Sequence, residues 1–311
     1  MRLPCSAAEF RADTAAAWKD AARAADVPPE FQTSVQRLFS QHSGDMTARR
    51  SSLANYILIH AIIQHIFLAR QTAGCRAGPG DATGNLPEKD ALLLKNALRN
   101  WQLGWERSRE SSLEPNCAHG PVAFNSTALL RLAYVRINID TGPSRALGTR
   151  DPVQIAQALR DMRMVRRSPG LTPALLHSAH AISIPIKIGI QLVARTQTFV
   201  WSIQHSLSSL ECALLLSKWL EAVSQSAWSG IDYALNGDER RIIGLVKTML
   251  DETEFAVPDE LVLDLAETAK HLSIGILKVW ATIFRGSQTW AIVDVIGSSL
   301  ELYAKILQAE G

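Results

Sequence analysis

The sequence HSLSSLECALLLSKWLEAV, residues 205–223, decides the fold class. Read as a helix, it is apolar on nearly every side, and its charged residues form one narrow strip of Glu211, Lys218 and Glu221. A helix of this kind is stable only when other helices surround it. The segment therefore predicts a buried helix at the centre of the fold.

The rest of the chain also has helical periodicity. Apolar residues at spacings of three and four predict about ten or eleven helices, and no run alternates as a strand would. The clearest stripes, near the C-terminus, are formed by Leu261, Leu265, Leu272, Ile276, Val279 and Ile283, and by Val293, Ile296, Leu300, Tyr303 and Leu307. Gly286 and Ser287 between them suit a helix end and a helix cap, which predicts an antiparallel hairpin. Pro185 is expected to kink or divide a helix over 175–195. The predicted fold is all-α, a single domain of packed helical hairpins around the central helix.

Composition limits the classes of function. Hydrophobic residues make up 47% of the 311 residues, which argues against a disordered activation tail. The 32 basic and 30 acidic residues leave a net charge of +2, so bulk charge favours neither nucleic acid nor an anionic membrane. The N-terminal residues lack the apolar core of a secretion signal.

The cysteines do not form a zinc-binding pattern. Cys5, Cys75, Cys117 and Cys212 are far apart in the sequence, whereas structural zinc sites use ligand pairs a few residues apart. His177 and His180 share a helical face, but no Glu follows the first His and no third ligand is indicated, so we favour hydrogen-bonded core residues over a metal site. Nucleophile elbows, phosphate loops and aspartate-rich motifs are absent, and the sequence predicts no enzyme.

Two segments have alternative interpretations. The uncharged segment 53–69 approaches the length of a membrane span, yet its scattered Asn and His residues favour a buried core helix. Basic residues gather over 145–167, namely Arg145, Arg150, Arg160, Arg163, Arg166 and Arg167. They could dock an acidic partner or form a weak nuclear-import element, but a solvated surface is the favoured interpretation.

Several long runs resemble a known family. They are GPVAFNSTALLRLAYVRINIDTGPSRAL (120–147), LLHSAHAISIPIKIGIQLVARTQTFVWSIQHSLSSLECALLLSKWLEAV (175–223), LPCSAAEF (3–10) and AAAWK (15–19). They resemble the regulatory domain of fungal transcription factors, the helical region of zinc-finger and zinc-cluster regulators similar to xylanolytic activators. The resemblance is clearest over 3–223, and 224–311 are expected to add C-terminal helical hairpins to the same domain, 1–311.

The resemblance implies transcription regulation in the nucleus without catalysis. The block at 3–19 resembles one that falls in the later half of the family's domain, so we expect the chain to begin inside the regulator and to lack the DNA-binding head. DNA and zinc would be bound only by that head, and no cofactor is expected in this chain. Its partners would be proteins, bound through self-association or as coregulators, and no binding to a membrane is expected. The alternatives are a headless helical interaction module that modulates such factors, and a helical small-ligand sensor or enzyme.

The polar segment RTQTFVWSIQH, residues 195–205, separates two apolar helices. Polar groups held between core helices must be hydrogen-bonded, so they either lock the packing or line a cavity. We favour locking of the packing. The cavity hypothesis assigns its lining, or an interaction site, to Arg195, Gln197, Trp201, Gln204 and His205.

Overall fold

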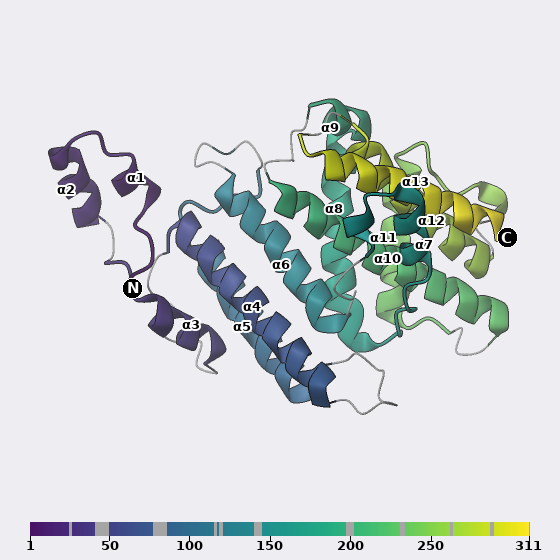
Figure 1. The fold of residues 1–311 in the computed structure, drawn as a ribbon, viewed down its shortest axis with the longest axis horizontal. Helices are drawn as coiled ribbons and strands as arrows, with labels where there is room; N and C mark the ends of the chain where they lie inside the picture. The colour runs from purple at the N-terminus through teal and green to yellow at the C-terminus, as the bar shows by residue number, and fades with distance from the viewer. Residues whose placement is uncertain are drawn as a thin grey trace. The chain divides into compact units, whose positions relative to one another are not determined.

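The computed structural model describes residues 1–24, 27–40, 50–76, 86–114, 117, 121–139, 145–196, 202–230, 234–261, 264–286 and 289–310. Every regular element among them is a helix, apart from an isolated antiparallel bridge between Arg2 and Glu30. The predicted all-α fold class is therefore confirmed (Figure 1). The chain divides into two compact units, 1–133 and 134–311, which are described separately. The assignment of 1–311 to one regulatory domain stays a prediction.

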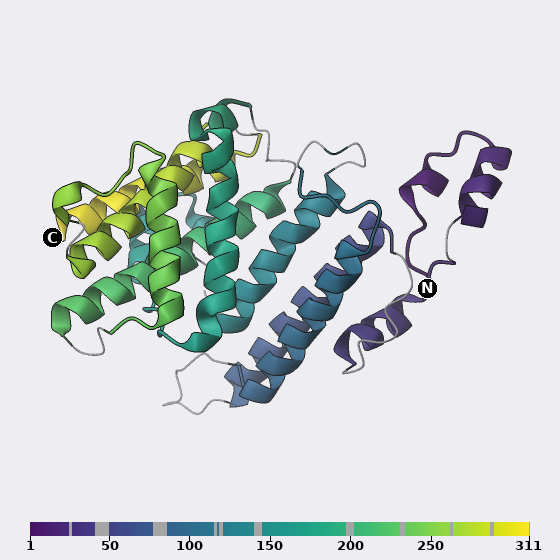
Figure 2. The ribbon, with the colours of Figure 1, turned by 180° about the vertical axis from the view of Figure 1, so that it is seen from behind.

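The first unit is built around a pair of long helices. Its elements are α1 (Ala7–Phe10), α2 (Ala15–Ala24), α3 (Phe31–Phe39), α4 (Ser52–Arg76), α5 (Glu88–Glu106) and the beginning of α6 (Val122–Asn138). Helices α4 and α5 lie side by side in both views (Figures 1 and 2). The buried Trp101 of α5 donates a hydrogen bond from Nε1 to the Asn55 carbonyl oxygen of α4 at 2.8 Å, which fixes their register.

Helix α4 contains the segment for which a membrane span was considered. Leu58, Ile59 and Ile62 are fully buried, whereas Phe67 and Leu68 are exposed. By length and composition alone, residues 52–75 could cross a membrane, and 39% of the apolar window is buried. The fully buried residues agree with a role in the core, and the expected absence of a membrane partner stays a prediction.

The second unit surrounds one helix with the others. Its elements are the end of α6, α7 (Pro152–Arg160), α8 (Thr172–Ile188), α9 (Ile190–Thr196), α10 (Ile203–Ser229), α11 (Gly237–Asp251), α12 (Leu265–Phe284) and α13 (Ala291–Ala309). Helix α10 packs against α12 and α8, and its residues from His205 to Leu220 are buried with the single exception of Leu207. The predicted central helix is therefore confirmed.

Helices α8 and α9 divide at a glycine rather than at Pro185. Pro185 lies within α8, which continues for three more residues. The break follows at Gly189, whose φ of 104° lies in a region that favours glycine. The proline was therefore a correct indication of a division, but Gly189 decides its position.

The C-terminal hairpin is also confirmed, since α12 packs along α13. The predicted cap Ser287 lies outside the described residues, and α13 begins only after Trp290, so the position predicted for its cap was wrong. Asp264 caps α12 by accepting hydrogen bonds from the backbone of Ala266 and Glu267. Leu261 precedes this cap, in a short 3-10 turn. Gly286 follows the end of α12 as predicted, but its φ is not positive. Its backbone instead lies against α9, because a Cβ atom added here would be 2.1 Å from the Ala194 carbonyl oxygen.

We expect Gly286→Ala to lower the free energy of unfolding by about 1–3 kcal/mol, because the methyl group forces α9 away from the hairpin. Urea denaturation followed by circular dichroism measures the change. Gly244→Ala is the matched control, since nothing lies within 4 Å of the added methyl group on α11. That control should be neutral or stabilising, by up to about 1 kcal/mol. Equal stability of the two variants would contradict the close approach.

Candidate functional site

The structure divides the segment predicted to line a polar cavity. Arg195 is exposed on α9, whereas Gln204 is half-buried and His205 buried on the first turn of α10. Gln197 and Trp201 lie outside the described residues. The described residues thus place Gln204 and His205 at the packed end of the central helix, and the cavity hypothesis stays a prediction.

The charged strip of the central helix forms a buried cluster with α13. Lys218 is 1% exposed, and its Nζ donates hydrogen bonds to Glu221 Oε2 at 3.2 Å and to the Arg160 carbonyl oxygen at 2.9 Å. The Tyr303 hydroxyl donates to Glu221 Oε1 at 2.5 Å, and Lys218 Nζ lies 4.9 Å from the centre of the tyrosine ring. These contacts join the end of α7 to α10 and α13.

Burial controls the ionisation of this cluster. It lowers the pKa of Lys218, although the Glu221 carboxylate partly opposes this change. Burial and the negative charge of Glu221 raise the pKa of the Tyr303 hydroxyl, which therefore stays protonated and donates. Ser217 extends the cluster to α12, because its hydroxyl lies 2.8 Å from that of Ser273. The sequence placed Tyr303 in an apolar stripe and carried no indication of its hydroxyl's partner.

Glu211, the remaining member of the strip, is held by two arginines. Its Oε1 accepts a hydrogen bond from Arg136 Nη2 of α6 at 2.8 Å and also pairs with Arg145. The Glu211 side chain is 2% exposed, and its Oε2 has no hydrogen-bond partner among the described residues. The carboxylate therefore joins α6 and the segment after it to the central helix.

Half of the arginines of the predicted basic surface form ion pairs within the chain; two of these pairs are largely buried, and the pair of Arg160 is exposed. Arg145 pairs with Glu211, Arg160 pairs with Glu310 at 2.5 Å, and Arg167 binds Glu239 through two parallel hydrogen bonds of 2.8 Å. These three arginines are committed to α10, the end of the chain and α11. An acidic partner would therefore meet a smaller basic surface than the sequence suggests.

The Arg167–Glu239 pair makes the free energy of unfolding depend on pH in the acid range. Hydrogen bonding to Arg167 is the main reason that the pKa of Glu239 lies below its usual value of 4.5. The unfolded chain therefore binds the proton first as the pH falls below 4.5, and this contribution to stability is lost on passing the folded pKa. We expect Glu239→Gln to remove this component from a plot of unfolding free energy against pH. Glu88→Gln, at an exposed carboxylate in the first turn of α5, is the control and should change the free energy of unfolding by no more than about 0.5 kcal/mol.

Of the two histidines that share a face of α8, His177 is half-buried and His180 is exposed, so the predicted core position is wrong for His180. His177 on α8 stacks on Tyr134 of α6, with ring centres 4.4 Å apart. In the part of the chain that the structure describes, no three His, Cys, Asp or Glu side chains form a group that could hold a metal ion.

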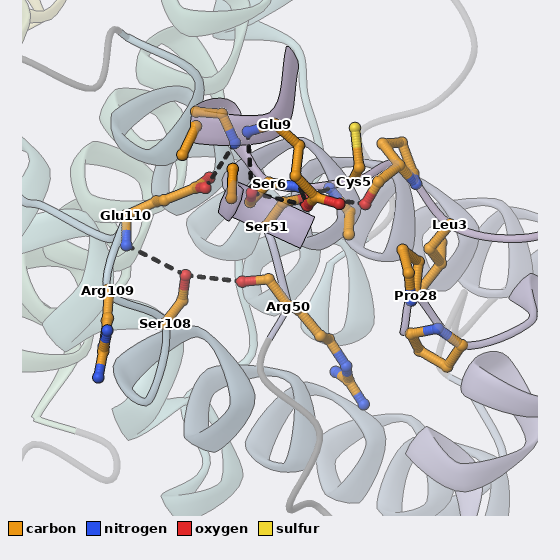
Figure 3. A pocket seen from close by; sticks show the side chains of 16 residues that line it. Leu3, Cys5, Ser6, Glu9, Pro28, Arg50, Ser51, Ser108, Arg109 and Glu110 are labelled. Carbon is orange, nitrogen blue, oxygen red and sulfur yellow. Dashed lines mark hydrogen bonds between the residues drawn. The ribbon is translucent and has the colours of Figure 1, made fainter. Parts of the chain in front are cut away.

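A pocket in the first unit has a volume of about 810 Å³ (Figure 3). It is lined by the N-terminal segment 3–9, Ala21 of α2, the segment 28–29, residues before and in the first turn of α4, and the turn after α5. Glu110, in the turn after α5, joins the N-terminal segment to the start of α4, since its Oε1 accepts from the Ala7 backbone at 2.8 Å and its Oε2 from the Ser52 backbone at 2.7 Å. Ser108 adds a hydrogen bond from its hydroxyl to the Arg50 carbonyl oxygen at 2.7 Å.

The sequence carries little indication of this pocket. Arg50 is its most buried charged residue, at 7% exposure. Burial, together with the charge of Arg37, lowers the pKa of the Arg50 guanidinium to about 10. The only indication in the sequence was a basic residue immediately before a long apolar helix, which is a weak one.

A comparison with protein families finds one match. The fungal transcription factor C-terminal domain matches residues 140–302, slightly more than half of the chain. The match includes the central helix and most of the C-terminal hairpin, whereas residues 1–139 lie outside it. No curated protein and no solved structure shows significant similarity to the chain.

The matched residues coincide with most of the second unit, whose central helix, buried charged cluster and ion pairs are described above. The family is a regulatory part of transcription factors and carries a role in transcription regulation. The chain therefore belongs to the fungal transcription factor C-terminal domain family.

Proposed function

We propose that this chain is the regulatory and interaction part of a zinc-dependent fungal transcription factor and acts in the nucleus without catalysis. The family match over 140–302 is the observation that carries the proposal. Zinc and DNA would be bound by a separate head. The chain itself would set the activity of that head through self-association or contact with coregulators.

Exposed aromatic residues of the second unit support a role in protein contact. Trp228, near the end of α10, is 67% exposed, and Trp290, before α13, is 46% exposed. Large aromatic side chains dominate the binding energy of many protein interfaces. Neither residue is needed to fill the core, so both can be replaced with little effect on folding.

A tethering assay tests the proposal. The full chain is fused to an unrelated DNA-binding domain in a filamentous fungus, and transcription of a reporter carrying that domain's site is measured. We expect the fusion to raise or lower reporter transcription, and we expect Trp228→Ser with Trp290→Ser to weaken this effect. Trp18→Ser is the matched control, because Trp18 is 49% exposed and lies outside the family match. A fusion without effect on transcription would overturn the proposal.

The headless alternative requires a separate measurement. Long-read sequencing of the native transcript determines whether the reading frame continues upstream into paired Cys and His codons. If it does, the factor itself binds zinc and DNA. If it does not, the chain modulates such factors through protein contact.

A further inference from the structure

An exposed serine precedes a proline in the segment between α7 and α8. Ser168, Pro169 and Gly170 are all exposed, whereas Val165 before them and Leu171 after them are buried and anchor the segment. The Ser168 side chain makes no capping hydrogen bond to the 3-10 turn that follows it. The serine is therefore accessible from solvent on a segment that is held at both ends.

The backbone of Ser168 has the conformation in which a protein kinase binds its substrate. Its φ of −158° and ψ of 150° are extended. Protein kinases bind the residues around the acceptor hydroxyl in an extended form, and proline-directed kinases select a serine or threonine that is followed by proline. The proline itself favours this conformation, because its ring disfavours the helical region for the residue before it. Ser168 and Pro169 therefore combine the dipeptide and the backbone that this class of kinase recognises.

The only other dipeptide of this kind in the sequence lies in the opposite structural context. Thr172 also precedes a proline, Pro173. It is half-buried and helical, with a φ of −46° and a ψ of −47°, and it begins α8. A kinase could bind Thr172 only after the first turn of α8 had opened, and Ala174 and Leu175 of that turn are buried. The structure thus separates two sites that look alike in the sequence.

The residues before Ser168 are basic. Arg163 and Arg166 are exposed, whereas Arg167 is bound to Glu239 through two hydrogen bonds of 2.8 Å. A phosphoserine carries a charge of about −1.5 to −2 at pH 7, which would offset the charges of the two exposed arginines. A phosphate on Ser168 would therefore remove the positive charge that the ion pairs of this segment leave on its surface.

We propose that Ser168 is a phosphorylation site for a proline-directed protein kinase. The kinase transfers the γ-phosphoryl group of ATP: a bond forms between that phosphorus and Ser168 Oγ, its bond to the oxygen bridging to ADP breaks, and the hydroxyl proton passes to the catalytic carboxylate of the kinase. The modification switches off the basic surface that an acidic partner would meet. It does not depend on the proposed role in transcription, although Ser168 lies within the family match over 140–302.

The full folded chain and a synthetic peptide of residues 161–176 are compared as kinase substrates. Each is incubated with a purified mitogen-activated protein kinase and Mg·ATP, and mass spectrometry follows the phosphate at Ser168 and at Thr172. The ratio of the two rates in the peptide gives the intrinsic preference of the kinase. In the full chain we expect this ratio to rise by about tenfold or more in favour of Ser168, since Thr172 reacts only when the first turn of α8 opens. An equal ratio in the chain and the peptide, or no phosphate at Ser168, would overturn the proposal.

Variants of the full chain identify what the kinase recognises. Ser168→Ala should abolish phosphorylation of this segment. Pro169→Ala keeps the hydroxyl and should lower the rate at Ser168 by about tenfold or more, because it removes the proline that this class of kinase selects. Pro173→Ala, at the other exposed proline, is the matched control and should leave the rate at Ser168 unchanged. Unaltered phosphorylation of Ser168 in Pro169→Ala would contradict recognition by a proline-directed kinase.

Protein isolated from a filamentous fungus shows whether the site is used in cells. A tagged full chain is recovered from mycelium grown with and without a phosphatase inhibitor, and its phosphopeptides are determined by mass spectrometry. We expect phosphate at Ser168 in the inhibitor-treated sample and none at Thr172. A chain that lacks phosphate at Ser168 in both samples would refute the proposal.

Discussion

Replacing Glu221 by leucine is expected to lower the free energy of unfolding by about 3–5 kcal/mol. The substitution removes the carboxylate that accepts hydrogen bonds from Lys218 and Tyr303. Lys218 is almost completely buried, and in this cluster its ammonium group would keep the hydrogen bond to the Arg160 carbonyl oxygen but lose its carboxylate partner. Leaving a charge buried without its partner costs more than the pair itself contributes.

The double variant Lys218→Met with Glu221→Leu separates the cost of leaving the Lys218 charge unpaired from the contribution of the ion pair itself. Buried ion pairs replaced by apolar residues of similar volume are often neutral, so the double variant should recover most of the lost stability. The Tyr303 hydroxyl still loses its acceptor, which leaves a deficit of about 1 kcal/mol. Urea denaturation measures these differences, provided that the slope of unfolding free energy against urea concentration is the same for all variants. If the double variant is no more stable than Glu221→Leu, the loss is not caused by the unpaired charge.

Glu301→Leu is the matched control, because Glu301 pairs with Lys305 on the partly exposed surface of α13. Exposed pairs of this spacing contribute about 0.3–0.5 kcal/mol, so the stability of this variant should remain close to that of the unmodified chain.

The pH dependence of the unfolding free energy gives an independent check on Lys218. The lowered pKa of Lys218 means that the unfolded chain binds more protons between the folded pKa and 10.5, so stability should rise with pH in that window. Lys218→Met should remove this rise.

The second large effect is expected at Glu211. Glu211→Leu leaves the guanidinium groups of Arg136 and Arg145 without the carboxylate that both of them contact. We expect a loss of about 3 kcal/mol in the free energy of unfolding, since Glu211 and Arg145 are both removed from water. Glu211→Gln keeps a hydrogen-bond acceptor without the charge and should lose less.

Glu252→Leu provides the control for Glu211, because Glu252 is an exposed carboxylate at the end of α11. Chemical denaturation should show a change of no more than about 0.5 kcal/mol for this control. A loss below about 1 kcal/mol for Glu211→Leu would mean that the arginines do not depend on Glu211 for their charge balance.

The sequence by itself predicted the helices, because their pattern of apolar residues lies within one continuous segment. An apolar surface on all sides of residues 205–223 required that other helices cover them, and the structure buries α10 accordingly. The stripes that end at Ile283 and begin at Val293 predicted the hairpin of α12 and α13. Helical periodicity is a reliable guide because the apolar residues of a helix mark which of its faces is buried, whichever neighbouring helices cover that face.

The partners of the polar residues were decided by the tertiary structure. The sequence marked Glu211, Lys218 and Glu221 as a strip, but their partners Arg136, Arg145 and Tyr303 are distant along the chain. Which side chains meet across two helices depends on the register and rotation of packed helices, and neither is encoded in periodicity. In the basic segment 145–167, Arg145 and Arg167 thus form largely buried ion pairs, whereas Arg160 pairs with Glu310 on the exposed surface.

The sequence by itself thus determined the helices, their buried faces and the family, through the run over 175–223, which lies within the matched residues 140–302. Only the tertiary structure shows why a glycine is needed at Gly286, which side chains pair with the buried charges, and where the pocket beside Arg50 lies. Each of these depends on atoms from separate segments that approach within a few ångströms. Local patterns report which residues avoid water, whereas close approach is determined by how the buried faces fit together.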